Sequence, residues 1–172
     1  RPLHVSLAVS WIFSIGIGAV YNYLEEKKII RFKVVGLIHW IVYVITGILI
    51  IISYLKGTFG GREYWEFPPV LSIPILISWL FFGLVFFSSV IKIKNWPVYL
   101  WMWSTGIVIF FVTFLEANSW IFDYFSNSVV RELTIQWKSY GSLVGSWNML
   151  VYGAGLYVME KISGEDSYAK SG

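Results

Sequence analysis

The sequence predicts an all-α integral membrane protein with five transmembrane helices. Of its 172 residues, 57% are hydrophobic and only 13% are charged, whereas about a quarter of the residues of a soluble domain are charged. The mean hydropathy is +0.67. Ten Trp and eleven Tyr are enough to furnish the aromatic belts found at both membrane–water interfaces. The composition therefore excludes a soluble protein with a large core.

Five apolar stretches are long enough to cross about 30 Å of hydrocarbon, which takes about 20 helical residues. They cover residues 4–24, 34–55, 70–91, 97–116 and 138–160. We therefore expect residues 1–162 to form a single transmembrane helical domain, followed by a polar C-terminal tail over 163–172. The sequence contains no internal repeat and no low-complexity tract.

The basic residues of the loops predict the orientation. One set of loops and ends carries eight Lys and Arg, and the other set carries five. The first set is Lys27, Lys28, Arg31, Lys33, Lys92, Lys94, Lys161 and Lys170, and the second is Arg1, Lys56, Arg62, Arg131 and Lys138. Because cytoplasmic loops are enriched in Lys and Arg, the first set is expected in the cytoplasm and the N-terminus outside.

Several function classes are excluded by residues that the sequence lacks. It has no Cys, which excludes disulfides, iron–sulfur clusters, thiolate metal sites and covalently attached c-type haem within this chain. It has no Walker glycine loop, no GxSxG and no HExxH. A net charge of +3, carried by short loops, gives no indication of nucleic-acid binding.

Two histidines are the strongest candidates for chemistry. His4 begins the first apolar stretch and is either an interfacial residue or an axial haem ligand through its neutral imidazole. His39 lies early in the second stretch, near the predicted depth of residues 18–20, about 20 Å from His4 along the membrane normal. The two therefore cannot clamp one haem, and we interpret His39 as a helix-packing or proton-related residue.

The loop after the second stretch is a second candidate site. It combines Arg62, Glu63 and three aromatic residues with a Pro pair at 68–69. It is either an interfacial anchor or a site where Arg62 pairs with haem propionates and Glu63 helps to hold a hard cation or a proton. The predicted topology places this loop on the same membrane face as His4. Glu116, at the outer end of the fourth stretch, is either solvated or part of a proton path.

Short motifs along nearly the whole chain resemble the N-terminal half of the large subunit of bacterial nitric oxide reductases. They are similar, more weakly, to the C-type haem-copper oxidases. The motifs are Arg1-Pro2-Leu3-His4-Val5 with Trp11, Gly18, Ala19, Tyr21, Tyr23 and Glu25-Glu26, Gly61-Arg62-Glu63-Tyr64 with Glu66 and Pro68, Gln136-Trp137 with Gly145-Ser146-Trp147, and Lys161-Ile162-Ser163-Gly164 with Asp166. The likeness covers family helices two to six of about twelve, and so implies a partial haem-copper oxidase-like bundle.

The resemblance implies roles for individual residues. His4 falls where the family ligates its low-spin b-type haem, Arg62 would face the haem propionates, and Glu63 falls where the reductases bind a bridging calcium. The non-haem metal site departs from the family pattern: Tyr140 replaces its first histidine, Val144 a metal-binding Glu and Asn148 a second Glu. Valine cannot ligate a metal, and residues 134–150 contain no histidine.

The resemblance therefore predicts a b-type haem electron-transfer subunit of a respiratory oxidoreductase complex, without its own non-haem metal site. Its haem would be shared with a partner membrane subunit that supplies the second axial ligand. A cytochrome c-like donor would dock on the outer face of a bacterial or archaeal inner membrane. Three alternatives remain: half of a split nitric oxide reductase or terminal oxidase, a haem-free structural subunit, and an unrelated transporter subunit.

Overall fold

The computed structural model describes residues 1–164, in which helices are joined by loops and there is no strand. The all-α prediction is therefore confirmed for this part of the chain, while Asp166 and Lys170 lie outside the described residues. The elements are α1 (Pro2–Glu26), α2 (Lys33–Leu55), η1 (Pro69–Leu71), α3 (Ser72–Val90), α4 (Val98–Ala117), η2 (Ser119–Ile121), α5 (Asp123–Ser126) and α6 (Val129–Ser163).

Four helical segments of the described residues are long and apolar enough to cross a membrane. They are Pro2–Glu26, Lys33–Leu55, Pro69–Val90 and Val98–Ile121. The chain is therefore a multi-pass membrane protein. The fifth predicted span, 138–160, lies inside α6, where Gly, Ser, Asn and Lys residues lower the hydropathy. Its crossing remains a prediction.

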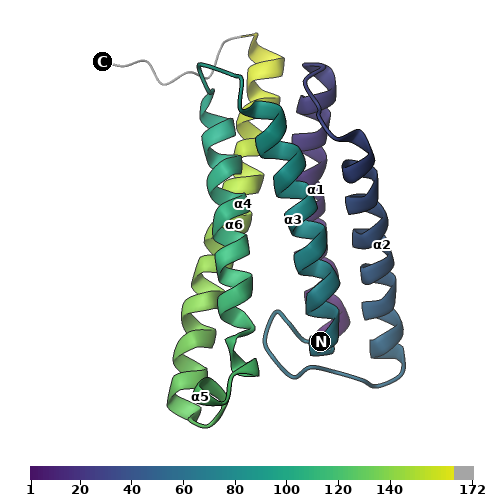
Figure 1. The fold of residues 1–172 in the computed structure, drawn as a ribbon, viewed down its shortest axis with the longest axis vertical. Coiled ribbons are helices and arrows are strands. Elements are labelled where there is room, and N and C mark those ends of the chain that lie inside the picture. Colours follow the sequence, from purple (N-terminus) through teal and green to yellow (C-terminus); the bar gives the residue numbers. More distant parts are fainter. Residues whose placement is uncertain (165–172) are drawn as a thin grey trace. The chain divides into compact units, whose positions relative to one another are not determined.

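The chain divides into two compact units, and the first covers Arg1–Asn95. In this unit α1, α2 and α3 run up, down and up, with the N-terminus beside the loop that follows α2 (Figure 1). Helix α1 begins with Pro2 at its first position, where a missing N–H costs no hydrogen bond. Helix α2 packs its backbone closely on α3, whereas α1 approaches α2 mainly through side chains.

The burial pattern of α2 explains why a membrane is needed. Its outward face exposes Val34 at 71%, Leu37 at 61% and Ile48 at 51%, while His39 on the opposite face is 0% exposed. A continuous apolar outer face with a polar residue inside is the reverse of a water-soluble helix, and it is stable when lipid covers the apolar side.

The second unit, which begins at Trp96, is a hairpin of α4 and α6 with η2 and α5 at its turn (Figure 1). Small residues let the two helices approach each other closely, as is typical of membrane helices. The Trp103 indole N–H donates to the Leu150 carbonyl at 3.1 Å, and the Ser146 hydroxyl donates to the Gly106 carbonyl at 2.9 Å. These two bonds fix the register of the hairpin.

Helix α6 is longer than a bilayer crossing needs. Its 35 residues extend about 52 Å at 1.5 Å per residue. Lys138 pairs with Glu116 in the last turn of α4, with 2.6 Å between Nζ and Oε1. Residues 129–137 therefore extend past the end of α4, and the helix stops at Gly164, whose left-handed φ of 72° favours glycine.

Candidate functional site

The loop between α2 and η1 has a fixed fold that depends on glycine. The Gly60 N–H donates to the Glu66 carbonyl at 2.7 Å, and Trp65 N–H donates to the Arg62 carbonyl at 3.1 Å. A Cβ on Gly60 would lie 2.1 Å from the carbonyl oxygen of Phe67, so no other residue fits there without moving the backbone. The loop therefore presents its side chains from a defined frame rather than from a random coil.

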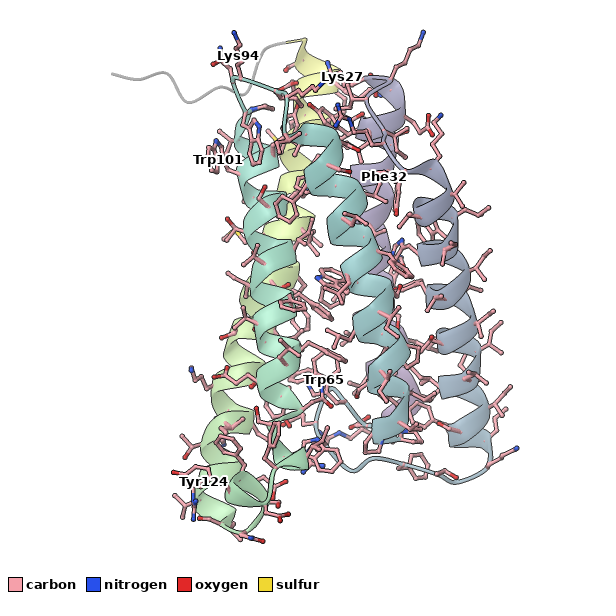
Figure 2. All side chains as sticks on the ribbon, viewed as in Figure 1. Lys27, Phe32, Trp65, Lys94, Trp101 and Tyr124 are labelled. Carbon is pink, nitrogen blue, oxygen red and sulfur yellow. The ribbon has the colours of Figure 1, made fainter. Side chains whose placement is uncertain are left out.

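Aromatic residues anchor this loop to the first unit. Trp65 and Phe67 are 8% and 5% exposed, and their rings meet edge to face with centroids 6.0 Å apart. Figure 2 shows Trp65 at the opposite end of the unit from Lys27 and Phe32. Buried aromatic area of this kind contributes more to holding a loop than exposed ion pairs do.

Arg1 joins the start of α1 to the loop. Its Nη2 lies 3.1 Å from Glu63 Oε1, and its Nε lies 3.7 Å from Glu66 Oε1. The side chains of Arg1 and Glu63 are 70% and 52% exposed, so this pair contributes at most about 1 kcal/mol to stability. Its importance is positional, because it brings His4, one turn along α1, to the same end of the unit as Arg62 and Glu63.

The His4 side chain is exposed and makes no hydrogen bond or ion pair with any residue in the part of the chain that the structure describes. Its imidazole is therefore available to a ligand that approaches from outside the unit. Arg62 is half-buried in the loop, and Glu63 is exposed. The structure thus brings together the three residues for which the sequence predicted cofactor binding, on a common end of the first unit.

Glu66 is a site residue that the sequence reasoning did not single out for a role. It is 8% exposed, and its Oε2 atom is buried without a hydrogen bond. An incompletely paired buried carboxylate is costly, which makes its position a candidate for function. Its burial depends on how the loop folds onto α1 and α2, which no local sequence pattern reveals.

His39 lies far from this end, as the depth argument predicted. Its Nδ1 is 3.0 Å from the hydroxyl of Tyr21. Tyr21 follows His4 by 17 residues on α1, which corresponds to about 25 Å along the helix axis. Two axial nitrogens of one haem must be about 4 Å apart, given metal–nitrogen distances near 2 Å. His39 is thus no partner for His4.

The remaining candidates lie in the second unit. Tyr140, Val144 and Asn148 recur every four residues on α6 and are all half-buried. The Tyr140 hydroxyl donates to Gln136 Oε1 at 3.2 Å, one turn earlier on the same helix. Glu116 is engaged by Lys138. Within residues 1–164, no group of three or more His, Cys, Asp or Glu is placed to hold a metal ion.

No family model matches the chain, and no curated protein and no solved structure matches it.

Proposed function

We propose that this chain is a b-type haem electron-transfer subunit of a membrane-bound respiratory oxidoreductase complex. The observation that carries the proposal is that His4, Arg62 and Glu63 share one end of the first unit, where Arg1 ties α1 to the loop. These are the residues that fall on haem and calcium positions in the resemblance to nitric oxide reductases.

The residues present fit one half of a haem site. The exposed imidazole of His4 offers one axial nitrogen, and the Arg62 guanidinium is suited to bidentate pairing with a propionate. A bound b-type haem would supply one-electron redox chemistry. Because His4 is exposed rather than packed in the core of its unit, a partner membrane subunit would have to supply the other ligand of the haem.

Glu63 is the candidate for a calcium ion near the propionates. Its Oε1 atom is shared with Arg1 at 3.1 Å. Calcium takes six to eight oxygen ligands, so Glu63 would be one ligand among several, and the Arg1 guanidinium would compete for the carboxylate. A calcium site here therefore requires oxygen ligands from other groups or from the partner subunit.

The proposal includes a fifth crossing by α6 and a partial haem-copper oxidase-like bundle. The N-terminus and the 56–69 loop face outward in a bacterial or archaeal inner membrane, where a cytochrome c-like donor docks. The former non-haem metal site is degenerate, since Val144 has no donor atom, while Tyr140 is hydrogen-bonded to Gln136. The chain therefore carries electrons without reducing a substrate by itself.

A reduced-minus-oxidised visible spectrum of the purified native complex tests the proposal. We expect a b-type α-band that His4→Ala removes or converts. His39→Gln is the matched control, because it alters the other histidine and leaves the band intact. A band unaffected by His4→Ala would contradict the ligand assignment. The absence of any such band in the native complex would favour a haem-free structural subunit.

A second measurement separates an electron carrier from half of a split enzyme. Nitric oxide reduction or oxygen reduction by the complex, together with a partner chain carrying several helix-borne histidines, would indicate the split enzyme. A complex that passes electrons from a cytochrome c to an acceptor, with neither activity, is the result expected here.

A further inference from the structure

The interface between α1 and α2 carries polar contacts along most of its length. Near the Arg1 end, the hydroxyls of Ser6 and Tyr54 lie 2.7 Å apart. In the middle, the hydroxyls of Ser14 and Tyr43 lie 2.9 Å apart. Six residues make up this row of contacts, and we call them the polar seam: Ser6, Ser14, Tyr21, His39, Tyr43 and Tyr54.

The seam follows helical periodicity on α1. Ser6, Ser10 and Ser14 are spaced by four residues, which puts them on one face of the helix. The Tyr43 hydroxyl also donates to the backbone carbonyl of Ser10 at 2.9 Å. Two tyrosines and one histidine of α2 thus meet hydroxyls of α1 at successive depths, in a layer that is otherwise apolar.

His39 is the one seam residue that readily takes up and releases a proton near neutral pH. It is 0% exposed, its Nδ1 is 3.0 Å from the Tyr21 hydroxyl, and its Nε2 has neither solvent contact nor a hydrogen bond. Leaving a buried polar atom without a partner costs about 1–3 kcal/mol. A leucine at this position would avoid that cost, so stability alone does not explain a histidine here.

The side chains around His39 are uncharged. The polar groups that face it are Tyr21 from α1, Tyr43 from α2 and Ser78 from α3, whose hydroxyl donates to the His39 carbonyl at 3.3 Å. Phe82 stacks on the imidazole at 5.3 Å between centroids. No acidic or basic side chain of residues 1–164 pairs with it.

A glycine makes the Tyr21–His39 contact possible. A Cβ on Gly36, one turn before His39, would lie 3.3 Å from the Tyr21 ring. A side chain of any size there would push the ring away from the imidazole. Gly36 thus leaves room for the Tyr21 ring, so that the Tyr21 hydroxyl can hydrogen-bond to His39.

Both ends of the seam reach carboxylates. Tyr21 is one turn from Glu25, which pairs with Lys33 at 3.4 Å at the exposed end of the unit. At the other end, Arg1, five residues before Ser6, pairs with Glu66 at 3.7 Å between Nε and Oε1, and Glu66 Oε2 is buried without a hydrogen bond. Each end of the seam therefore lies near a carboxylate, a group that can accept a proton.

We propose that the polar seam is a proton pathway through the first unit, with His39 as the group that takes up and releases the proton. A proton arriving from the Tyr21 side bonds to Nδ1 of His39, and the proton on Nε2 leaves toward the Tyr43 and Ser14 hydroxyls. Each step breaks one bond to hydrogen and forms another, with no change in oxidation state. Between the hydrogen-bonded pairs, protons pass by hydroxyl rotation and through transient water. The pathway does not depend on bound haem.

The test is proton flux into liposomes that contain the full chain and an entrapped pH-sensitive dye, driven by a potassium diffusion potential with valinomycin. We expect a flux above that of protein-free vesicles. His39→Gln and Tyr43→Phe should each lower it about a hundredfold, the low end of what a proton-transferring side chain contributes. Tyr99→Phe is the matched control, because it removes a tyrosine hydroxyl that donates to Glu160 in the second unit.

Each outcome decides between a pathway and a packing role. A flux no higher than in protein-free vesicles, or one that His39→Gln leaves unchanged, overturns the proposal. An equal loss in Tyr99→Phe also overturns it, since the flux would then be a general leak. If His39→Gln fails to insert, Tyr21→Phe and Ser14→Ala delete single hydroxyls instead. Loss of flux in both, with helix content unchanged by circular dichroism, supports the pathway, and unchanged flux refutes it.

Discussion

At the scale of single residues, Gly60 controls the loop that carries Arg62 and Glu63. We expect Gly60→Ala to open this loop, because the added Cβ would lie 2.1 Å from the backbone oxygen of Phe67. Trypsin cleavage after Arg62 in detergent-solubilised protein is the measurement, and it should be faster in the variant. Gly47→Ala is the control, since no atom lies within 4 Å of a Cβ there. Equal cleavage of all three proteins would show that the loop does not require Gly60.

The sequence allowed functional residues to be predicted where they are close together along the chain, but not where the contact joins distant elements. Arg62 and Glu63 could be selected because charge and aromatic residues cluster within one short loop, and His4 because it stands at the edge of an apolar stretch. The burial of Glu66 and the bond between Tyr21 and His39 depend on elements separated along the sequence. Only the approximate depth of His39 followed from counting residues across the first turn.

At the scale of elements, the contact between α4 and α6 depends on Gly153. A Cβ at this position would lie 2.7 Å from Trp103 and 3.3 Å from the Tyr99 carbonyl. We expect Gly153→Ala to lower the free energy of unfolding in SDS titration by about 1–3 kcal/mol, the usual cost of overpacking. Gly155→Ala, two residues away with no atom within 4 Å, should raise stability by up to about 1 kcal/mol through helix propensity. Equal effects of the two variants would contradict the close approach of the helices.

The ion pair between Glu116 and Lys138 also belongs to this hairpin. Because the lysine side chain is 68% exposed, we expect Glu116→Gln to lower the free energy of unfolding by no more than about 1 kcal/mol. It should leave proton flux in liposomes unchanged, since Glu116 lies outside the polar seam. A loss of flux in Glu116→Gln would instead assign it to a proton path. The exchange variant Glu116→Lys/Lys138→Glu should recover the stability lost in either single variant.

Hydropathy located four of the helices to within two residues at every end, but it did not reveal that α6 begins nine residues before the predicted fifth span. The predicted stretch began at 138, whereas the helix begins at Val129 after Ser128, whose hydroxyl accepts from the Arg131 N–H at 3.5 Å. The added turns contain Arg131 and Glu132, which no membrane-span pattern includes. The start of α6 is therefore set by the Ser128 cap and by packing against α5, and not by the transfer of apolar residues into lipid.

At the scale of the whole molecule, the orientation and the fifth crossing can be measured together. The chain has no native Cys, so single-cysteine variants report topology directly. Phe59→Cys and Ser126→Cys should react with a membrane-impermeant thiol reagent from one side of sealed vesicles. Lys28→Cys, Lys94→Cys and Ile162→Cys should react from the other. All five sites are exposed in the structure.

Ile162→Cys decides whether α6 crosses. If α6 spans the membrane, positions 126 and 162 react from opposite sides, because the crossing lies between them. If α6 instead lies along the surface, both react from the same side as Phe59→Cys, and the four-span topology holds. The larger number of Lys and Arg at the Lys28 end predicts that Lys28→Cys, Lys94→Cys and Ile162→Cys react from the cytoplasmic side. Reaction of Lys28→Cys from the outer face would invert the orientation, and a cytochrome c-like donor could then no longer reach the end that carries His4 and Arg62.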